Sequence, residues 1–138
     1  METITTFTVR YAETDQMGIV HHSVYPIWFE AGRTDFIRQA GISYSEIEKK
    51  GLLLPLIQLT CNYMSAAKYE DAVTVATSLR SMTFTRLRMS YTVKVEGSPG
   101  IIATGETLHV WTDLNLKPLN LKKNFPELYE LLYRHITA

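Results

Sequence analysis

The residues best suited to chemistry lie in one short segment, residues 9–25, which combines carboxylates, two adjacent histidines and two tyrosines. Asp15 is the foremost candidate, because it lies in a glycine-containing loop just before a predicted helix. An ionised carboxylate there can act as a nucleophile or general base, while helix N-terminal amides polarise a carbonyl. The same position also suits an Asx turn or a helix cap. The residue pattern leaves both interpretations open.

His21, His22 and Tyr11 are the polar side chains that could assist such a carboxylate. The two histidines are adjacent, so their side chains diverge in extended chain and cannot both face one site. A loop histidine is more often a surface or hydrogen-bonding residue than a catalytic one. Tyr11 lies four residues before Asp15, where its hydroxyl could reach the same site. Tyr25 and Trp28 are expected to pack in the core.

Basic residues that could bind the phosphates of a ligand are scattered along the predicted strands: Lys68, Arg86 and Arg88. A solvated strand face explains them equally well. The charged residues of the predicted long helix, by contrast, are expected to form surface pairs three or four residues apart: Glu30, Arg33, Asp35 and Arg38.

The element that must position Asp15 is a long amphipathic helix. Apolar residues alternate over 5–11, which predicts a strand, and residues 12–18 form a loop. A helix is predicted over 23–40, with Val24, Ile27, Trp28, Ala31 and Ile37 on its apolar stripe. Ser23 is its expected N-cap and Gly41 its expected stop.

Most of the remaining chain has the alternation of strands. The segments are 57–63, 73–80, 86–95 and 101–111, with a turn over 96–100 that joins the last two as a hairpin. A short helix is predicted over 45–50, and a closing helix over 126–135 with Asn124 as a possible cap. Cys61 alternates inward with Leu59 and Tyr63, which favours a buried structural cysteine. One strand, one long helix and four strands with hairpin-like connections predict an α+β fold with an antiparallel sheet.

Composition narrows the class of protein. The length of 138 residues predicts a single domain over 1–138. Lysine plus arginine (14) balance aspartate plus glutamate (14), so net charge favours neither a nucleic-acid partner nor an anionic membrane. The single cysteine excludes an internal disulfide, and no zinc-ligand spacing is present. With no signal-peptide pattern and no apolar span, a cytoplasmic protein without integral membrane contact is expected.

A set of residues in this region resembles the hotdog-fold acyl-CoA thioesterases, specifically the 4-hydroxybenzoyl-CoA thioesterase group and its YbgC-like branch. The residues that carry the resemblance are Arg10, Tyr11, Glu13, Thr14, Asp15, Met17, Gly18, Val20, His22, Tyr25, Phe29, Glu30 and Arg33. The likeness continues more loosely through residues 68–71 to the final helix.

The resemblance implies a sheet wrapped around the long helix and a homodimer or homotetramer whose active site lies at the subunit boundary. It implies hydrolysis of an acyl-CoA substrate with no cofactor. Asp15 matches the family's essential carboxylate, as nucleophile or general base. His22 and Tyr11 match supporting polar residues, and the amides around His22 match the group that polarises the thioester carbonyl.

One departure from the family pattern concerns the coenzyme. A basic run that helps to bind the coenzyme A phosphates in the 4-hydroxybenzoyl enzyme falls here on residues 83–85, which carry no charge. An acyl carrier protein could therefore replace coenzyme A as the acyl donor. Two other functions stay open: a 3-hydroxyacyl-thioester dehydratase that uses His22 with Glu30, and a non-catalytic acyl-thioester binding module.

Overall fold

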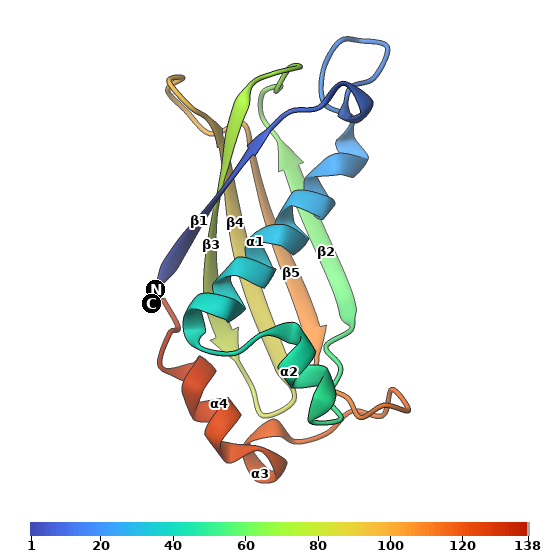
Figure 1. Ribbon diagram of the computed structural model, residues 1–138, viewed down its shortest axis with the longest axis vertical. Helices are drawn as coiled ribbons and strands as arrows, with labels where there is room; N and C mark the ends of the chain where they lie inside the picture. The colour runs from blue at the N-terminus through green and yellow to red at the C-terminus, as the bar shows by residue number, and fades with distance from the viewer. Residues whose placement is uncertain (138) are drawn as a thin grey trace.

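The computed structural model describes residues 1–137 and consists of one antiparallel sheet that curves around one long helix (Figure 1). The five strands follow the order β1-β3-β4-β5-β2 across the sheet. Their bounds are β1 Glu2–Thr8, β2 Leu56–Tyr63, β3 Ala72–Met82, β4 Arg86–Val95 and β5 Ala103–Val110. The helices are α1 Tyr25–Ala40, α2 Tyr44–Lys49, α3 Leu121–Asn124 and α4 Pro126–Tyr133. The predicted α+β architecture, with the sheet wrapped around one long helix, is confirmed.

The connection between β2 and β3 differs from the prediction. The turns after β3 and β4 are hairpins, as expected, but β2 pairs with β5 at the edge of the sheet, with Cys61 opposite Gly105. The chain then crosses from that edge to β3, which lies between β1 and β4. Strand alternation indicates which residues are extended, but it does not specify which strand each one pairs with.

Helix α1 packs its buried stripe into the concave face of the sheet. The buried residues follow helical spacing: Tyr25, Trp28, Phe29, Gly32, Phe36, Ile37 and Ala40. The ring of Phe29 stacks on Tyr91 with ring centroids 4.5 Å apart and lies over Gly105, where a Cβ would overlap it. Ile27, predicted on this stripe, is instead 62% exposed. The stripe is therefore rotated from the predicted one, towards the aromatic side chains.

Local caps and boundaries also differ from the predictions. Strand β1 ends at Thr8, so Tyr11 lies in a 3-10 turn, Tyr11–Glu13, and not at a strand end. A second 3-10 turn, His22–Val24, leads directly into α1, and Ser23 lies inside it instead of capping the helix. Asn124 ends α3, and α4 has no side-chain cap. These changes are within a few residues of the predicted boundaries, as is usual for helix and strand ends.

Strand β2 is an edge strand with apolar side chains on its surface. Leu56, Ile57, Leu59 and Tyr63 are between 37% and 48% exposed, although Leu59 and Tyr63 were predicted to point inward. Cys61 is half-buried. Within residues 1–137, β2 pairs with β5 alone and ends the sheet, so its other edge leaves backbone groups available for another strand.

Candidate active site

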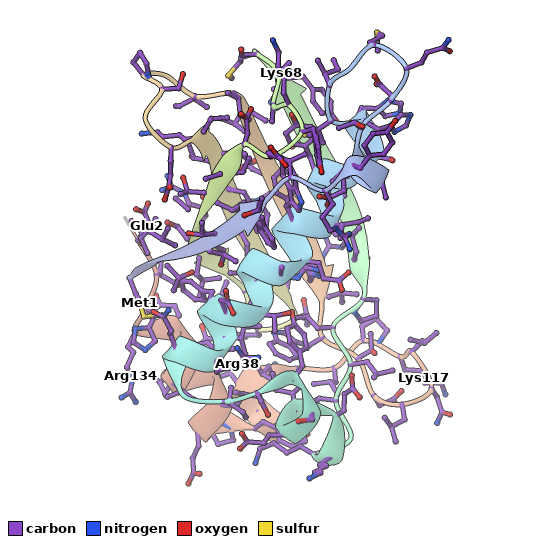
Figure 2. The ribbon with its side chains drawn as sticks, turned by 45° about the horizontal axis from the view of Figure 1, so that its top comes forward. Met1, Glu2, Arg38, Lys68, Lys117 and Arg134 are labelled. Atoms are coloured by element: carbon purple, nitrogen blue, oxygen red, sulfur yellow. The ribbon has the colours of Figure 1, made fainter. Side chains whose placement is uncertain are left out.

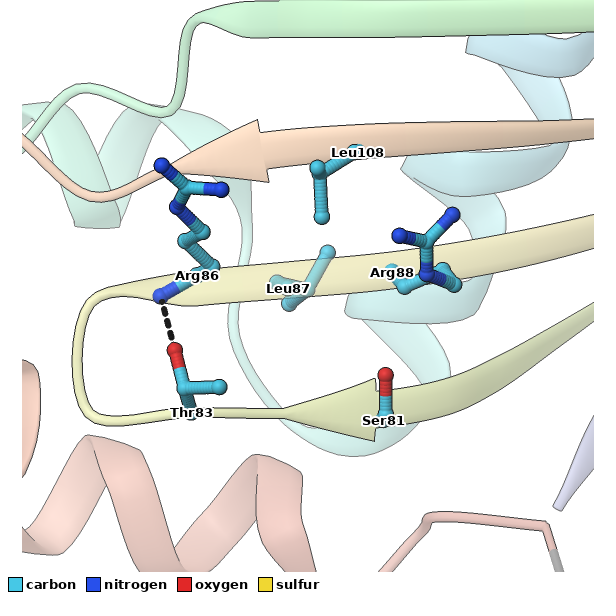
Figure 3. Close-up of a pocket in the computed structure, with 6 residues that line it drawn as sticks. All are labelled: Ser81, Thr83, Arg86, Leu87, Arg88 and Leu108. Atoms are coloured by element: carbon cyan, nitrogen blue, oxygen red, sulfur yellow. Dashed lines mark hydrogen bonds between the residues drawn. The ribbon is translucent and has the colours of Figure 1, made fainter.

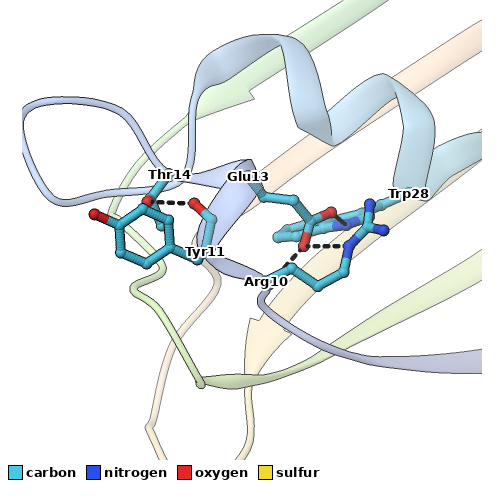
Figure 4. Close-up of polar contacts among 5 residues, drawn as sticks. All are labelled: Arg10, Tyr11, Glu13, Thr14 and Trp28. Carbon is cyan, nitrogen blue, oxygen red and sulfur yellow. Dashed lines mark hydrogen bonds and ion pairs between the residues drawn. The ribbon is translucent and has the colours of Figure 1, made fainter.

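The loop between β1 and α1 is anchored by a buried carboxylate that the sequence analysis did not single out. Glu13 is only 7% exposed, and its Oε2 accepts a hydrogen bond from the indole Nε1 of Trp28 at 3.2 Å. Its Oε1 accepts the Arg10 backbone N–H at 2.8 Å and pairs with the Arg10 Nε at 3.5 Å (Figure 4). A buried carboxylate requires such partners. Glu13 therefore ties the loop to the first turns of α1.

Asp15 opens the tight turn of this loop. Its backbone N–H donates to the Ile19 carbonyl at 2.8 Å, and its carbonyl accepts the Gly18 N–H at 2.9 Å. Gly18 has φ +81°, a conformation that favours glycine. The Asp15 Oδ1 accepts the Met17 N–H at 2.8 Å, so the Asx turn that the sequence allowed is present. Within residues 1–137, Oδ2 has no hydrogen-bond partner, and the carboxylate is half-buried.

The loop folds back so that Asp15 comes near the start of α1. Thr14 and Val20 form an antiparallel bridge, and the His21 N–H donates to the Glu13 carbonyl at 2.9 Å. The Val20 N–H donates to the Ala67 carbonyl at 2.9 Å, which fixes the loop against the segment before β3. The backbone of the loop is thus held by its own ladder and by a second segment.

His21 and His22 have different surroundings, as their adjacency predicted. The His21 Nδ1 accepts the Ser23 N–H at 3.2 Å and lies 2.8 Å from the Ser23 Oγ, so His21 has a capping role. His22 is exposed on the 3-10 turn, and its ring lies 4.1 Å from that of His21, centroid to centroid. In the part of the chain that the structure describes, the His22 backbone N–H has no acceptor. It is a free donor at the start of a helical segment.

Tyr63 is a second residue of this region that sequence reasoning did not assign to the site. Its hydroxyl donates to the His22 carbonyl at 2.8 Å, and its ring packs edge-on against Tyr25 at 5.2 Å between centroids. Burial, followed by the hydrogen-bond interaction with the Cys61 sulfur, raises the pKa of the Tyr63 hydroxyl to about 12. The hydroxyl is therefore a proton donor at neutral pH. Tyr63 is 41 positions from His22, so no local pattern could have connected the two.

Tyr11 is at the same end of the molecule but points into solvent. It is 77% exposed, and its ring meets that of Tyr69 edge to face at 5.6 Å. Thr14 holds its backbone through a hydrogen bond from Oγ to the Tyr11 carbonyl at 2.7 Å (Figure 4). Among residues 1–137, no hydrogen bond joins the side chains of Tyr11, Asp15 and His22. The three share one loop region without forming a bonded triad.

The three predicted phosphate-binding residues do not lie together. Lys68 is at the end of the molecule that carries the Asp15 loop (Figure 2), and its backbone N–H donates to Asp71. Arg86 and Arg88 lie near the β3–β4 hairpin at the opposite end of the sheet, beside a cavity of about 210 Å³ (Figures 1 and 3). Arg88 also approaches Glu106, with 3.7 Å between NH1 and Oε2. Within a single chain, Arg86 and Arg88 are therefore too far from the Asp15 loop to belong to the same site.

No sequence pattern indicated the polar network under α1, which is formed by Arg33, Tyr44, Tyr91 and Thr107. The Arg33 Nε donates to the Tyr44 hydroxyl at 3.2 Å, and its NH1 donates to the Tyr91 hydroxyl at 3.1 Å. The Tyr91 hydroxyl lies 2.6 Å from the Thr107 Oγ1. The surface pair predicted for Arg33 is wrong, whereas that between Asp35 and Arg38 is present at 3.3 Å.

Burial and the Arg33 charge lower the pKa of nearby His109 from 6.5 to about 4, so His109 is neutral at pH 7.

No group of three or more His, Cys, Asp or Glu side chains within residues 1–137 could hold a metal ion. No helix in the same range is long and apolar enough to cross a membrane. The chemistry available at the Asp15 loop is therefore that of a carboxylate, a histidine and hydrogen-bond donors at a helix start.

Comparison with known proteins assigns the family. A model of the thioesterase-like superfamily matches residues 9–130, which include the whole Asp15 loop and strands β2 to β5 but not β1. The chain belongs to this superfamily. It is thus an enzyme of the thioesterase class, as the sequence predicted, and the hotdog fold is confirmed.

Individual relatives agree with this assignment. The putative acyl-CoA thioesterase YneP of Bacillus subtilis is 37% identical over 121 residues, which cover 86% of each chain. The acyl-CoA thioester hydrolase YbgC of Escherichia coli is 27% identical and is matched over 84% of this chain and 87% of its own. The DHNA-CoA thioesterase structure from Staphylococcus aureus superposes with a TM-score of 0.91 at 33% identity, over 96% of this chain and 89% of its own. The expected likeness to YbgC is confirmed.

Proposed function

We propose that this protein hydrolyses acyl-CoA thioesters and that Asp15 drives the reaction. The observation that carries the proposal is the state of the Asp15 carboxylate: one oxygen holds the turn, and the other has no partner within residues 1–137. Glu13 anchors the loop to α1, so Asp15 contributes to the structure of the loop through only one of its two oxygens. The names of the relatives supply the substrate class.

In this mechanism the Asp15 carboxylate removes a proton from water while the water oxygen attacks the thioester carbon. The alternative is direct attack by the carboxylate on the thioester carbon, which breaks the C–S bond, expels coenzyme A as a thiolate and leaves a mixed anhydride that water then hydrolyses. The His22 N–H polarises the carbonyl oxygen as a free donor at the helix start, and Tyr63 holds the His22 carbonyl in place. The C–S bond then breaks, and coenzyme A leaves as a thiolate. His22 and Tyr11 assist by contact with the substrate.

The active unit of the proposal is a homodimer formed through β2, which can assemble further into a tetramer. The free edge of β2 and its apolar side chains Leu56, Ile57 and Leu59 suit a second copy of the same strand. Analytical ultracentrifugation at micromolar concentration should detect no monomer. The substitution Ile57→Lys places a charge on this surface and should produce monomers with reduced turnover. A fully active monomer would refute an active site shared between subunits.

Two other functions are separated by one assay. Release of free thiol from a panel of acyl-CoAs, followed with a thiol-trapping dye, supports hydrolysis. Loss of water from 3-hydroxyacyl-CoA without thiol release would instead support a dehydratase that uses His22 and Glu30. No hydrogen bond links these two side chains among residues 1–137. Binding with neither reaction would indicate a non-catalytic module.

The donor is tested in the same panel, with each acyl group presented on coenzyme A and on an acyl carrier protein. Equal or better turnover of the carrier-protein thioester would identify that protein as the donor. Asp15→Asn is the control in both arms, because thiol release that persists in this variant would not come from the proposed site. A single turnover in ¹⁸O-labelled water distinguishes direct attack, which first puts an enzyme oxygen into the product, from base-assisted attack.

A further inference from the structure

A groove of about 220 Å³ runs between α1 and β2, on the concave side of the sheet. Its apolar walls include Ile27 from α1 and Leu56 and Leu59 from β2, all of them more than a third exposed in the single chain. Leu56 and Leu59 also belong to the strand edge proposed above as the dimer contact, so the groove borders that contact. Arg33 and Thr107 supply a guanidinium and a hydroxyl to the same groove. An apolar groove with a few polar groups is the usual form of a small-molecule site.

Among residues 1–137, Arg33 is a cation without an acidic partner. Its guanidinium has five N–H donors, of which Nε and NH1 each donate to a tyrosine hydroxyl. No carboxylate of residues 1–137 lies within 4.0 Å of it, not even that of Glu30 one turn earlier. His109, which also lies close to it, is neutral at pH 7. A charge withdrawn from water is costly unless an anion or acceptor compensates it.

The network beneath α1 holds this cation in a fixed position. Tyr44 and Tyr91 each accept from one of its nitrogens, and Thr107 bonds Tyr91 in turn. The remaining N–H donors of Arg33 have no acceptor within residues 1–137, and the network holds them in place at the groove. Fixed donors of this type favour an oxygen acceptor, which a guanidinium can bind with two parallel hydrogen bonds.

We propose that this groove binds the acyl group and that Arg33 selects acyl groups with an oxygen acceptor at the end remote from the thioester. This inference rests on the proposed thioesterase function. Pro26, in the first turn of α1, begins the groove, and Arg33 is seven residues further along, or about 10 Å at 1.5 Å per residue. A thioester at the helix start would therefore direct its acyl chain along the apolar walls towards Arg33.

The acceptor can be a carboxylate or a hydroxyl, and Glu30 discriminates between them. Glu30 is exposed at the same groove, where water screens its charge more than that of the partly buried Arg33. A terminal carboxylate gains from Arg33 and is opposed by Glu30. A terminal hydroxyl can accept from Arg33 and donate to Glu30. Glu30→Gln should therefore raise turnover of the carboxylate substrate and lower that of the hydroxyl substrate.

The test compares three thioesters that differ only at the remote end: hexanoyl-CoA, 6-hydroxyhexanoyl-CoA and adipoyl-CoA. We expect kcat/KM for one of the oxygenated substrates to exceed that for hexanoyl-CoA by about tenfold or more, as hydrogen bonds to charged groups allow. Arg33→Met should remove this preference, measured as the ratio of kcat/KM on the oxygenated substrate to kcat/KM on hexanoyl-CoA in the same folded variant. Arg38→Met, on the exposed face of the same helix, is the matched control and should retain the preference.

A wild-type enzyme without the preference, or a preference that survives Arg33→Met, would overturn the inference. So would equal loss on all three substrates together with loss of the dimer, because the groove would then be a subunit contact. Arg33→Lys, which keeps the charge but not the planar fork, serves if the methionine variant does not fold, and it should weaken the preference. Full retention of the preference in Arg33→Lys would contradict recognition by the guanidinium fork.

A binding measurement keeps this inference separate from the proposed function. Calorimetry with the free acids adipate, 6-hydroxyhexanoate and hexanoate requires no hydrolysis. Tighter binding of an oxygenated acid to the wild type, lost in Arg33→Met, supports the groove even if no acyl-CoA is hydrolysed. Hydrolysis that depends on Asp15, with equal binding of all three acids, supports the thioesterase and refutes the role of Arg33.

Discussion

The loop before α1 and the network beneath α1 use similar polar residues in opposite ways. In the loop, backbone hydrogen bonds and the Glu13 side chain hold the conformation. One Asp15 oxygen and the His22 N–H have no partner within residues 1–137. In the network, the side chains of Arg33, Tyr44 and Tyr91 bond one another in the interior. We therefore expect substitutions of Asp15 and His22 to change activity but not the free energy of unfolding, whereas substitutions in the network should change the free energy of unfolding as well.

Glu13 lies in the loop, but its side chain is buried and hydrogen-bonded like those of the network. It lies two residues from Asp15, yet it is buried and both of its oxygens have partners. Two carboxylates this close in sequence therefore differ in burial and in hydrogen bonding: Glu13 is an anchor, whereas one Asp15 oxygen has no partner within residues 1–137. Their substitutions are the sharpest way to test the comparison.

The largest effect is expected from Asp15→Asn. The asparagine Oδ1 can still accept the Met17 N–H, so the turn and the free energy of unfolding should be nearly unchanged. Turnover should fall by about 10²- to 10⁴-fold, the usual contribution of a positioned base. Steady-state kinetics and urea denaturation measure the two quantities. Near-normal turnover would remove Asp15 from the mechanism and the comparison with it.

Acid pH should destabilise the network through His109. The pKa of His109 is about 4 in the folded protein and 6.5 in the unfolded chain, because burial and Arg33 oppose its charge. Between these values the unfolded chain binds a proton that the folded protein does not, so stability falls as pH falls from about 6.5 to 4. The loss from this group is about 3 kcal/mol. Denaturation at several pH values should show a shallower decline in His109→Gln than in the wild type.

Glu13→Gln should separate anchoring from chemistry. The glutamine amide can accept one of the hydrogen bonds but places N–H groups against the other donor, so a buried donor loses its acceptor. The free energy of unfolding should decrease by about 1–3 kcal/mol. Turnover measured well below the unfolding midpoint should fall far less than in Asp15→Asn. Equal loss of turnover in both variants, with stability intact, would contradict the division of roles.

The two histidines should differ despite their adjacency. His22→Ala should reduce kcat/KM by about tenfold, in line with one lost hydrogen bond or contact to substrate. His21→Ala should affect activity less, because His21 is occupied with Ser23. Both variants should be checked by circular dichroism. Equal losses in two folded variants would indicate that the cap and the exposed ring contribute alike.

The smallest effect is expected from Tyr11→Phe, which removes only a hydroxyl from an exposed ring. The edge-to-face contact with Tyr69 remains, so the fold should be unaffected. A decrease in kcat/KM of a few-fold at most is expected for one exposed hydrogen bond. Tyr69→Phe is a matched control on the partner ring. A loss comparable to that of Asp15→Asn would place Tyr11 among the essential groups.

The fold and the position of the Asp15 loop could be predicted because they depend on local patterns. The alternation of apolar residues in β4 and the turn after it predicted a hairpin that the structure contains. The glycine at position 18 and the apolar helix that follows predicted the loop and its place before α1. These features arise from contacts between residues close in sequence, where spacing determines which side chains share a face.

Other features required the tertiary structure. The pairing of β2 with β5 and the bond from Tyr63 to His22 join segments distant in the chain, and no local pattern specifies them. Arg33 looked like a surface residue because its neighbours are charged. It turns inward because Tyr44 and Tyr91, from two other elements, offer acceptors.

The sequence by itself therefore determined the elements, their order and the residues able to do chemistry, since side-chain type and spacing are local properties. Only the tertiary structure decided that Glu13 is an anchor, that one Asp15 oxygen has no partner within residues 1–137, and that Arg33 lines a groove next to β2. Burial and hydrogen-bond partners come from packing between distant segments, and these set whether a charged group stabilises the fold or stays available to a ligand.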